Sequence, residues 1–248
     1  MLRLTPAQAA QLTDWYAPLP PGPQVLGHAV CTGHGAVWAD RWPAPRALLA
    51  DVAGNYALAG DPAALSAAGL PPLAGFVEAP PPLAPLLRAA CPAAIEWARV
   101  IYALPGEPAD PPPVAAAVRP LARGDAAQLA ALSDESDWIS KTWGGPAGLA
   151  ASGLAWGAFV EGRLASVANA FFAGPRYVDL GVATEPEFRG RGFSPACAAA
   201  LCRQVRAGGR QPCWSTSLDN PASQRVAEKL GFVFERHDVL YVTGVPLP

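Results

Sequence analysis

The chain has 248 residues, about half of them apolar, and 18 Lys and Arg against 20 Asp and Glu give a net charge of −2. The composition is typical of a packed protein, and the charge gives no electrostatic argument for binding nucleic acid or an acidic membrane. No long apolar run free of charge or proline occurs, and the N-terminus lacks the basic-then-apolar signal pattern, so we expect a cytoplasmic protein.

The cysteines are scattered along the chain without a C-x-x-C pair: Cys31, Cys91, Cys197, Cys202 and Cys213. Their odd number and irregular spacing argue against a disulfide framework and a cysteine zinc site. We expect Cys197 and Cys202 to pack inside a helix. His28, Cys31 and His34 could be drawn as a metal triad, but no fourth ligand is evident, so we expect no bound metal.

The first hundred residues are predicted to form a small α/β part. Thr5 to Tyr16 is expected as a helix, with Thr5 as its N-cap and Pro6 at its first position. Val25 to Trp38 alternates loosely between apolar and polar residues, which indicates a strand or hairpin. Another helix is expected at Arg46 to Tyr56.

A proline-rich segment, residues 105–113, divides the sequence. It follows an expected strand, Trp97 to Leu104, and its closely spaced prolines cannot continue a helix or a central strand. We interpret the segment as a semi-rigid linker. The predicted domains are therefore 1–104 and 114–248.

The second domain begins with a predicted strand at Val114 to Pro120 and a helix at Asp125 to Leu132, with Asp125 as its N-cap. Two further strands are expected at Trp156 to Val160 and Leu164 to Phe172. Residues 161–163 would join them as a hairpin-like turn.

The next segment joins an extended run to a helix through a loop rich in arginine and glycine. Tyr177 to Thr184 is the expected strand, and small residues from Ser194 to Cys202 form the expected helix. Glycines let a backbone approach phosphate oxygens closely, and the free N–H groups of a first helical turn point at the anion. Arg189 and Arg191 would add charge-assisted hydrogen bonds. The alternative is an ordinary glycine turn with two solvated arginines.

A second motif follows the expected strand at Pro212 to Ser217. Its elements are Asn220, Ser223 and the run E-K-L-G-F at Glu228 to Phe232. With these two motifs in order, the sequence resembles the GNAT superfamily of N-acetyltransferases. The run R-G-R-G-F-S at Arg189 to Ser194 corresponds to the acetyl-CoA loop of that family, which follows R-x-x-G-x-G/A. The resemblance extends from Val114 to the C-terminus.

The resemblance implies an α/β fold with a mixed central sheet flanked by helices, preceded by a smaller N-terminal α/β domain, sometimes an incomplete copy of the catalytic one. It also implies transfer of an acetyl group from acetyl-CoA, the cosubstrate, to a primary amine by direct attack. In the family, the fourth and fifth strands part and the pantetheine arm enters between them. The implied cofactor-binding residues are Val182, Ala183 and Thr184 through their main chain, and Arg189, Gly190, Arg191, Gly192, Phe193, Ser194, Asn220 and Ser223.

Asp179 is the candidate proton acceptor. Period-two alternation places it on one face of the strand with Tyr177 and Gly181, where many relatives hold a carboxylate that acts directly or through water. The alternative is a structural hydrogen-bond acceptor. Ala227 stands where many relatives carry a tyrosine that protonates the departing thiolate, so another group or water would do so, or the thiolate would leave unassisted.

The acceptor is expected to be a small-molecule amine. An acidic segment beside tryptophans, residues 133–139 and Trp143, would suit a cationic amine; the alternative is a solvated loop with a tryptophan anchored in the core. Two other functions stay open, a CoA-binding module with little turnover and an acyltransferase for longer acyl groups. A homodimer is also left open.

Overall fold

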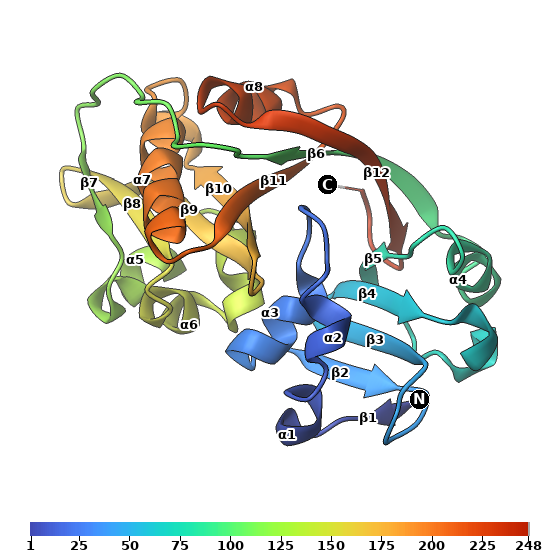
Figure 1. Ribbon diagram of the computed structural model, residues 1–248. Coiled ribbons are helices and arrows are strands. Elements are labelled where there is room, and N and C mark those ends of the chain that lie inside the picture. Colours follow the sequence, from blue (N-terminus) through green and yellow to red (C-terminus); the bar gives the residue numbers. More distant parts are fainter. Residues whose placement is uncertain (248) are drawn as a thin grey trace. The chain divides into compact units, whose positions relative to one another are not determined.

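The computed structural model describes residues 1–247 (Figure 1). Its contacts define two compact units. The first consists of Met1–Leu19, Gln24–Arg99 and His237–Pro248, and the second of Pro20–Pro23 and Val100–Arg236. These units differ from the predicted domains, 1–104 and 114–248, because two long strands, at residues 95–103 and 233–243, contribute residues to both units. The domain boundaries stay a prediction. Within residues 1–247, no helix has both the length and the apolarity needed to cross a membrane.

The first unit is built on a mixed sheet. Its strands follow the order β1-β2-β3-β4-β5-β12. β4 and β5 pair in parallel, and the other neighbouring strands in this order pair antiparallel. The elements are β1 (Leu2–Arg3), α1 (Pro6–Ala9), α2 (Thr13–Tyr16), α3 (Val25–Thr32), β2 (Ala36–Ala39), β3 (Ala47–Val52), β4 (Asn55–Gly60), η1 (Pro62–Ala64), η2 (Ala67–Gly69), β5 (Gly75–Glu78), α4 (Ala84–Ala90) and β12 (Val233–Thr243).

The expected N-terminal helix is present but interrupted between α1 and α2. Its N-cap is confirmed: the Thr5 hydroxyl accepts a hydrogen bond from the Gln8 N–H, and the Gln8 side chain accepts from the Thr5 N–H in a capping box.

Two predictions in this unit are wrong. Val25 to Trp38 is neither one strand nor a hairpin: only its end, from Ala36, belongs to a strand, β2. Val25, Leu26 and Ala29 recur at helical spacing on the buried side of α3, which ends at Gly33 with a left-handed φ of 73°. Arg46 to Tyr56 is not a helix. Ala53 and Gly54, with φ of 52° and 78°, form the two-residue turn between β3 and β4.

The second unit contains the strands in the order β6-β11-β10-β9-β8-β7, mixed in direction: β10 is parallel to β11 and antiparallel to β9. The elements are β6 (Ile95–Ala103), β7 (Ala117–Pro120), η3 (Arg123–Asp125), α5 (Ala126–Ala130), η4 (Asp137–Trp143), α6 (Pro146–Ala151), β8 (Ala155–Val160), β9 (Arg163–Ala173), β10 (Tyr177–Thr184), η5 (Pro186–Phe188), α7 (Phe193–Ala207), β11 (Gln211–Ser217) and α8 (Pro221–Lys229).

The predicted strands and helices of this unit are therefore confirmed, with bounds shifted by a few residues. Asp125 precedes α5 as expected, but its carboxylate does not cap that helix. It accepts hydrogen bonds from the Ala122 N–H and from both terminal nitrogens of Arg119. The Arg119 guanidinium lowers the pKa of the Asp125 carboxyl.

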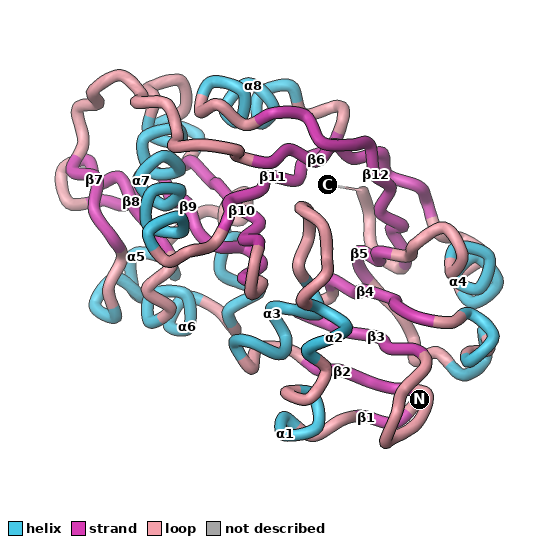
Figure 2. Tube along the Cα trace, in the orientation of Figure 1, coloured by secondary structure: helices cyan, strands magenta, loops and turns pink. Residues whose placement is uncertain are grey.

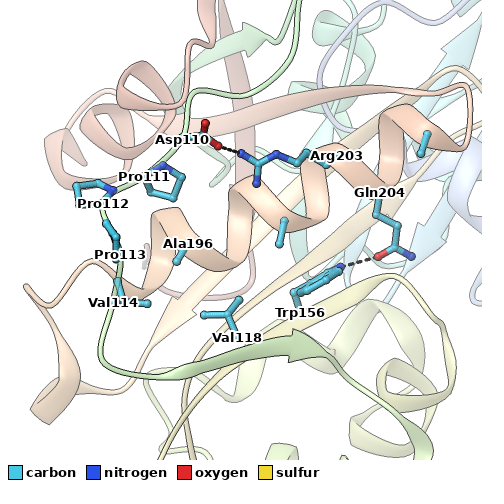
Figure 3. A pocket seen from close by; sticks show the side chains of 12 residues that line it. Asp110, Pro111, Pro112, Pro113, Val114, Val118, Trp156, Ala196, Arg203 and Gln204 are labelled. Atoms are coloured by element: carbon cyan, nitrogen blue, oxygen red, sulfur yellow. Dashed lines mark hydrogen bonds and ion pairs between the residues drawn. The ribbon is translucent and has the colours of Figure 1, made fainter.

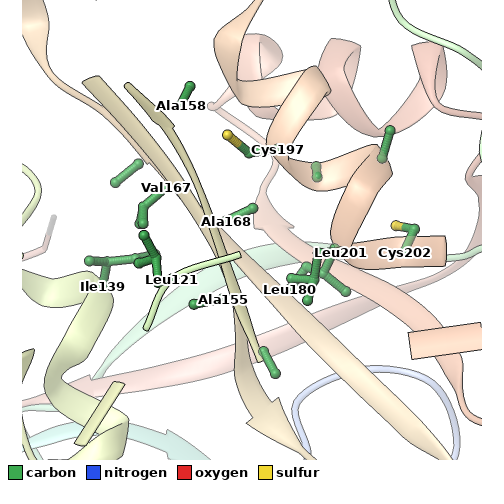
Figure 4. Close-up of a cluster of buried hydrophobic side chains, with 14 of the residues drawn as sticks. Leu121, Ile139, Ala155, Ala158, Val167, Ala168, Leu180, Cys197, Leu201 and Cys202 are labelled. Atoms are coloured by element: carbon green, nitrogen blue, oxygen red, sulfur yellow. The ribbon is translucent and has the colours of Figure 1, made fainter. Parts of the chain in front are cut away.

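Helical segments flank this sheet on both faces, as the colouring of Figure 2 shows. Helix α7 packs on β8, β9 and β10 through small buried residues, among them Cys197 and Ala198. Figure 4 shows Cys197 and Ala168 in the same buried cluster. Ile139 of η4 lies with Val167 on the opposite side of the sheet (Figure 4). Small side chains let α7 approach the sheet closely, and its N-terminus follows the carboxyl end of β10.

The cysteines of α7 are packing residues, as expected. Cys197 and Cys202 are fully buried, and burial raises the pKa of each thiol to about 12. All five cysteines are free thiols. In residues 1–247 no three His, Cys, Asp or Glu side chains are grouped to hold a metal ion, and Cys31 of the drawn triad is exposed.

We predict that Leu201→Ala in α7 lowers the free energy of unfolding by about 2–5 kcal/mol, because Leu201 is completely buried in the core of the second unit. Leu218→Ala is the matched control, since Leu218 is 47% exposed; its effect should stay within about 0.5 kcal/mol. Urea unfolding followed by circular dichroism measures both. Equal losses would contradict the packing described for α7.

Candidate active site

The site is organised by two parallel strands that part. β10 and β11 pair at three positions only, and the last is Asp179 opposite Cys213. Beyond it, β10 runs on to Thr184 and β11 to Ser217 without pairing to each other. Strands that separate in this way leave one side of each backbone without ladder partners, which creates a row of main-chain donors and acceptors facing the opening.

The register identifies which groups of β10 face the opening. The Glu185 N–H donates to the Ala165 carbonyl on the β9 side, at 3.0 Å. Because antiparallel partners alternate between bonded and non-bonded pairs, the polar main-chain groups of Ala183 point toward β9, while those of Val182 and Thr184 point away from it. The Ser166 hydroxyl accordingly donates to the Ala183 carbonyl at 2.9 Å.

Of the three predicted main-chain contacts, the register therefore favours Val182 and Thr184 over Ala183. The Thr184 carbonyl already accepts from Arg189 Nε at 3.3 Å, which ties the end of β10 to the loop that follows.

Asp179 lies at the last paired position, where the strands begin to part. Asp179 is only 4% exposed, and its Oδ1 accepts a hydrogen bond from the Ser215 hydroxyl of β11 at 2.9 Å. Ser215 comes two residues after Cys213 and so shares its face of β11. Sequence reasoning missed Ser215; the signal that could have identified it is the parallel pairing of the two strands.

The loop between β10 and α7 has an open, glycine-dependent backbone. Gly190 and Gly192 have left-handed φ values of 76° and 80°, and Gly192 is the N-cap of α7. A methyl group added at Gly190 would meet no atom within 4 Å, so the space above this backbone is open. The first N–H groups of α7 have no acceptor within the helix. This arrangement can bind an anion.

The loop contains buried aromatic side chains, which hold it in place, and charged arginine side chains. Phe193 is buried and its ring lies 6.4 Å from that of Phe188, so Phe193 can reach a ligand only through its main chain. Arg191 stacks over Phe188 with 5.4 Å between the guanidinium carbon and the ring centre. Arg189 forms an exposed ion pair with Glu135 at 2.6 Å. Ser194 belongs to the first turn of α7.

Asn220 and Ser223 of the second motif have structural partners. The Asn220 side chain is the N-cap of α8 and accepts from the Ser223 N–H at 3.0 Å. The Ser223 hydroxyl accepts from Trp214 Nε1 at 2.9 Å, which links α8 to β11. Their contact with a cofactor stays a prediction. Ala227 is completely buried in the same helix.

The acidic segment near residue 135 is largely occupied by partners within the protein. Glu135 pairs with Arg189, and Asp137 pairs with Lys141 at 3.1 Å. Trp143 is buried, and its indole N–H donates to the Ala170 carbonyl at 2.7 Å. These contacts favour the alternative of a loop with an anchored tryptophan. Sequence reasoning also missed Glu185, which is buried and accepts from the backbone and hydroxyl of Ser133.

A separate groove of about 660 Å³ runs along the outer face of α7 (Figure 3). Arg203 forms an ion pair with Asp110 across it, and Trp156 Nε1 donates to Gln204 Oε1 at 2.6 Å. The proline-rich segment at residues 110–113 forms one side of the groove. None of the predicted site residues lines it.

Comparison with known proteins finds related sequences and similar folds. The family model described as GNAT acetyltransferase matches residues 113–241. A Streptomyces virginiae protein described as an uncharacterized N-acetyltransferase is 42% identical over 212 residues, which cover 84% of this chain and 89% of that protein.

Two solved structures share the fold. A GCN5-related N-acetyltransferase-like protein from Streptococcus suis has a TM-score of 0.70 at 17% identity and covers 96% of this chain and 98% of its own. A tandem GNAT protein from the clavulanic acid biosynthesis pathway has a TM-score of 0.58 at 16% identity, covering 100% of this chain and 99% of its own. The predicted fold class is confirmed.

We predict that Val182→Pro weakens turnover of acetyl-CoA about 100-fold or more, because proline removes an N–H that faces the opening beside β10. Val182→Ala keeps this N–H and is the matched control, with an expected loss of only a few-fold. Release of free CoA, followed with a thiol reagent, measures both. Equal losses in the two variants would show that the side chain, not the main chain, matters at this position.

Proposed function

Because the chain belongs to the GNAT family of acetyltransferases, we propose that it transfers the acetyl group of acetyl-CoA to a primary amine of a small molecule. The observation that carries the proposal is the separation of β10 from β11 directly after Asp179. It brings unpaired main-chain donors and a buried carboxylate to the same opening. We also expect the reaction to take place in the cytoplasm.

The diphosphate of CoA fits the loop at the start of α7. Gly190 has no side chain to block the approach of the phosphates, and the first N–H groups of α7 supply donors with a partial positive charge. Arg189 and Arg191 lie in the same loop and add full charges. Arg189 would give up part of its exposed ion pair with Glu135 to bind the phosphate. The loss of free energy would be small, because exposed ion pairs contribute little to stability.

The pantetheine arm would enter between β10 and β11. The outward main-chain groups of Val182 and Thr184 can bond its amides and the thioester carbonyl in the manner of an added strand. A main-chain N–H directed at the carbonyl oxygen stabilises the negative charge that develops there when the amine attacks. One such donor is worth about 3 kcal/mol of transition-state stabilisation.

Asp179 would accept the proton that the amine loses, directly or through water. The carboxylate is buried at the point where the strands part, and the Ser215 hydroxyl fixes the orientation of its Oδ1. The tetrahedral intermediate then collapses, the carbon–sulfur bond breaks, and CoA leaves as a thiolate. Ala227 cannot protonate it, so the thiolate leaves unassisted or takes its proton from water.

We predict that Asp179→Asn lowers kcat/KM for the amine by about 100-fold or more, because the amide cannot accept the proton. The affinity for acetyl-CoA should stay within about twofold, since Asp179 does not lie in the phosphate loop. Glu161→Gln, in the exposed turn between β8 and β9, is the control and should have no effect. Steady-state kinetics and calorimetry measure the two quantities. Unchanged turnover would remove Asp179 from the mechanism.

We predict that Gly190→Ala lowers the affinity for CoA by about tenfold or more, because the methyl group strains the left-handed backbone and occupies the open space above it. Gly162→Ala is the matched control: its φ is 81°, it also has no atom within 4 Å of the added methyl group, and it lies in the β8–β9 turn. Calorimetric titration with CoA compares the variants. Equal affinities would mean that the phosphates bind elsewhere.

A further inference from the structure

One short segment of the N-terminal sequence belongs to the second unit. Pro20–Pro23, the loop between α2 and α3 in Figure 1, is grouped with Val100–Arg236, although the residues on both sides of it belong to the first unit. Its Gly22 N–H donates to the Cys213 sulfur at 3.3 Å, and the Cys213 thiol donates back to the Gly22 carbonyl at 3.4 Å. The segment is therefore seated on β11.

Arg236 anchors the segment from a second side. Its Nη1 donates to the Pro21 carbonyl at 2.6 Å. Pro21 and Gly22 are buried, and Gly22 has a φ of 134°. A methyl group added there would lie 3.0 Å from Arg236 Nη2. Only glycine adopts this backbone without strain, so the segment has one well-defined position on the strand.

The segment covers the same face of the sheet as Asp179. Cys213 is the register partner of Asp179, and directly opposed residues of neighbouring strands present their side chains on one face. The hydrogen bond from Ser215, two residues later, confirms that face. Burial raises the pKa of the Cys213 thiol well above its ordinary value, and the charge of Asp179 raises it further. Gly22 thus contacts the residue of β11 that is paired with Asp179.

A second segment, η4, lies on the same face further along β10. Gly181 follows two residues later on β10, and a methyl group there would lie 2.6 Å from Asn169 Oδ1 and 3.0 Å from Ile139 Cδ1 of η4. Two segments of the second unit therefore lie near Asp179 on this face: η4 beside Gly181 on β10, and Pro20–Pro23 beside Cys213 on β11.

We propose that Pro20–Pro23 is a wall of the acceptor site and limits the acceptor to primary amines that are unbranched at the carbon bearing the nitrogen. The inference rests on the proposed function and deepens it. The segment offers proline rings and a glycine backbone but no charged side chain, so it selects by shape. A substituent on that carbon would meet the segment, whereas a linear chain passes between it and η4.

The test uses two CoA thioethers in which an alkyl amide stands for the acceptor amine. It therefore does not require that the natural acceptor be known. CoA-S-CH₂-CO-NH-R is prepared with R as n-propyl or isopropyl, which have the same composition and differ only in branching. The wild-type protein should bind the n-propyl conjugate about tenfold more tightly than the isopropyl one, the scale set by one misplaced methyl group. Calorimetry gives both affinities, with CoA alone as the reference.

Gly22→Ala should displace the segment and reduce the preference to about threefold or less, while the affinity for CoA alone stays unchanged. If this variant does not fold, Arg236→Gln removes the anchor of the Pro21 carbonyl and should act in the same direction. Gly153→Ala is the matched control, because Gly153 has a φ of 68°, lies in the second unit and has open space around it; it should keep the wild-type preference.

The outcomes separate the two proposals. If the wild-type protein binds CoA but does not discriminate between the conjugates, or if the preference survives in Gly22→Ala and Arg236→Gln, the wall is overturned and the acetyltransferase proposal stands. If CoA itself does not bind to the folded wild-type protein, the proposed function fails, and the inference fails with it.

Discussion

The candidate site depends on the separation of two parallel strands, β10 and β11, after only three paired positions. Up to Asp179 and Cys213, β10 and β11 satisfy each other's main-chain groups; beyond that rung they do not. Unpaired main-chain groups at a strand edge attract an extended ligand with amides of its own. The carboxylate at the last rung and the glycine-rich loop at the end of β10 then lie along one continuous stretch of backbone, so a ligand that pairs with β10 would reach both.

Small side chains keep this geometry in place. Cys197 and Ala198 of α7 are fully buried in the core that the helix forms with the sheet, so the helix lies close to β9 and β10. Two aromatic rings, Phe188 and Phe193, fix the start of α7 beneath the loop. The exposed glycine backbone above them therefore does not need side-chain contacts of its own, and it remains available to a ligand.

Much of the second unit could be predicted from its sequence, because its motifs combine strand alternation with glycines whose φ values only that residue adopts readily. Tyr177–Thr184 was predicted with the bounds that the structure shows. The first unit was predicted less well, since the run Ala47–Val52, which is buried except for the half-buried Asp51, lacks alternation and resembles a helix. Ser215 and the Pro20–Pro23 segment were missed because their importance depends on pairing between distant strands, which a single sequence does not display.

Amide hydrogen exchange with and without CoA shows whether the ligand binds along β10 and the loop that follows, because it locates the ligand on the backbone. We predict that CoA slows exchange in peptides covering residues 180–184 and 190–196, while peptides from α3 and β3 in the first unit exchange as before. Protection confined to other segments, or no change anywhere at a CoA concentration that saturates a CoA-binding control protein, would contradict it.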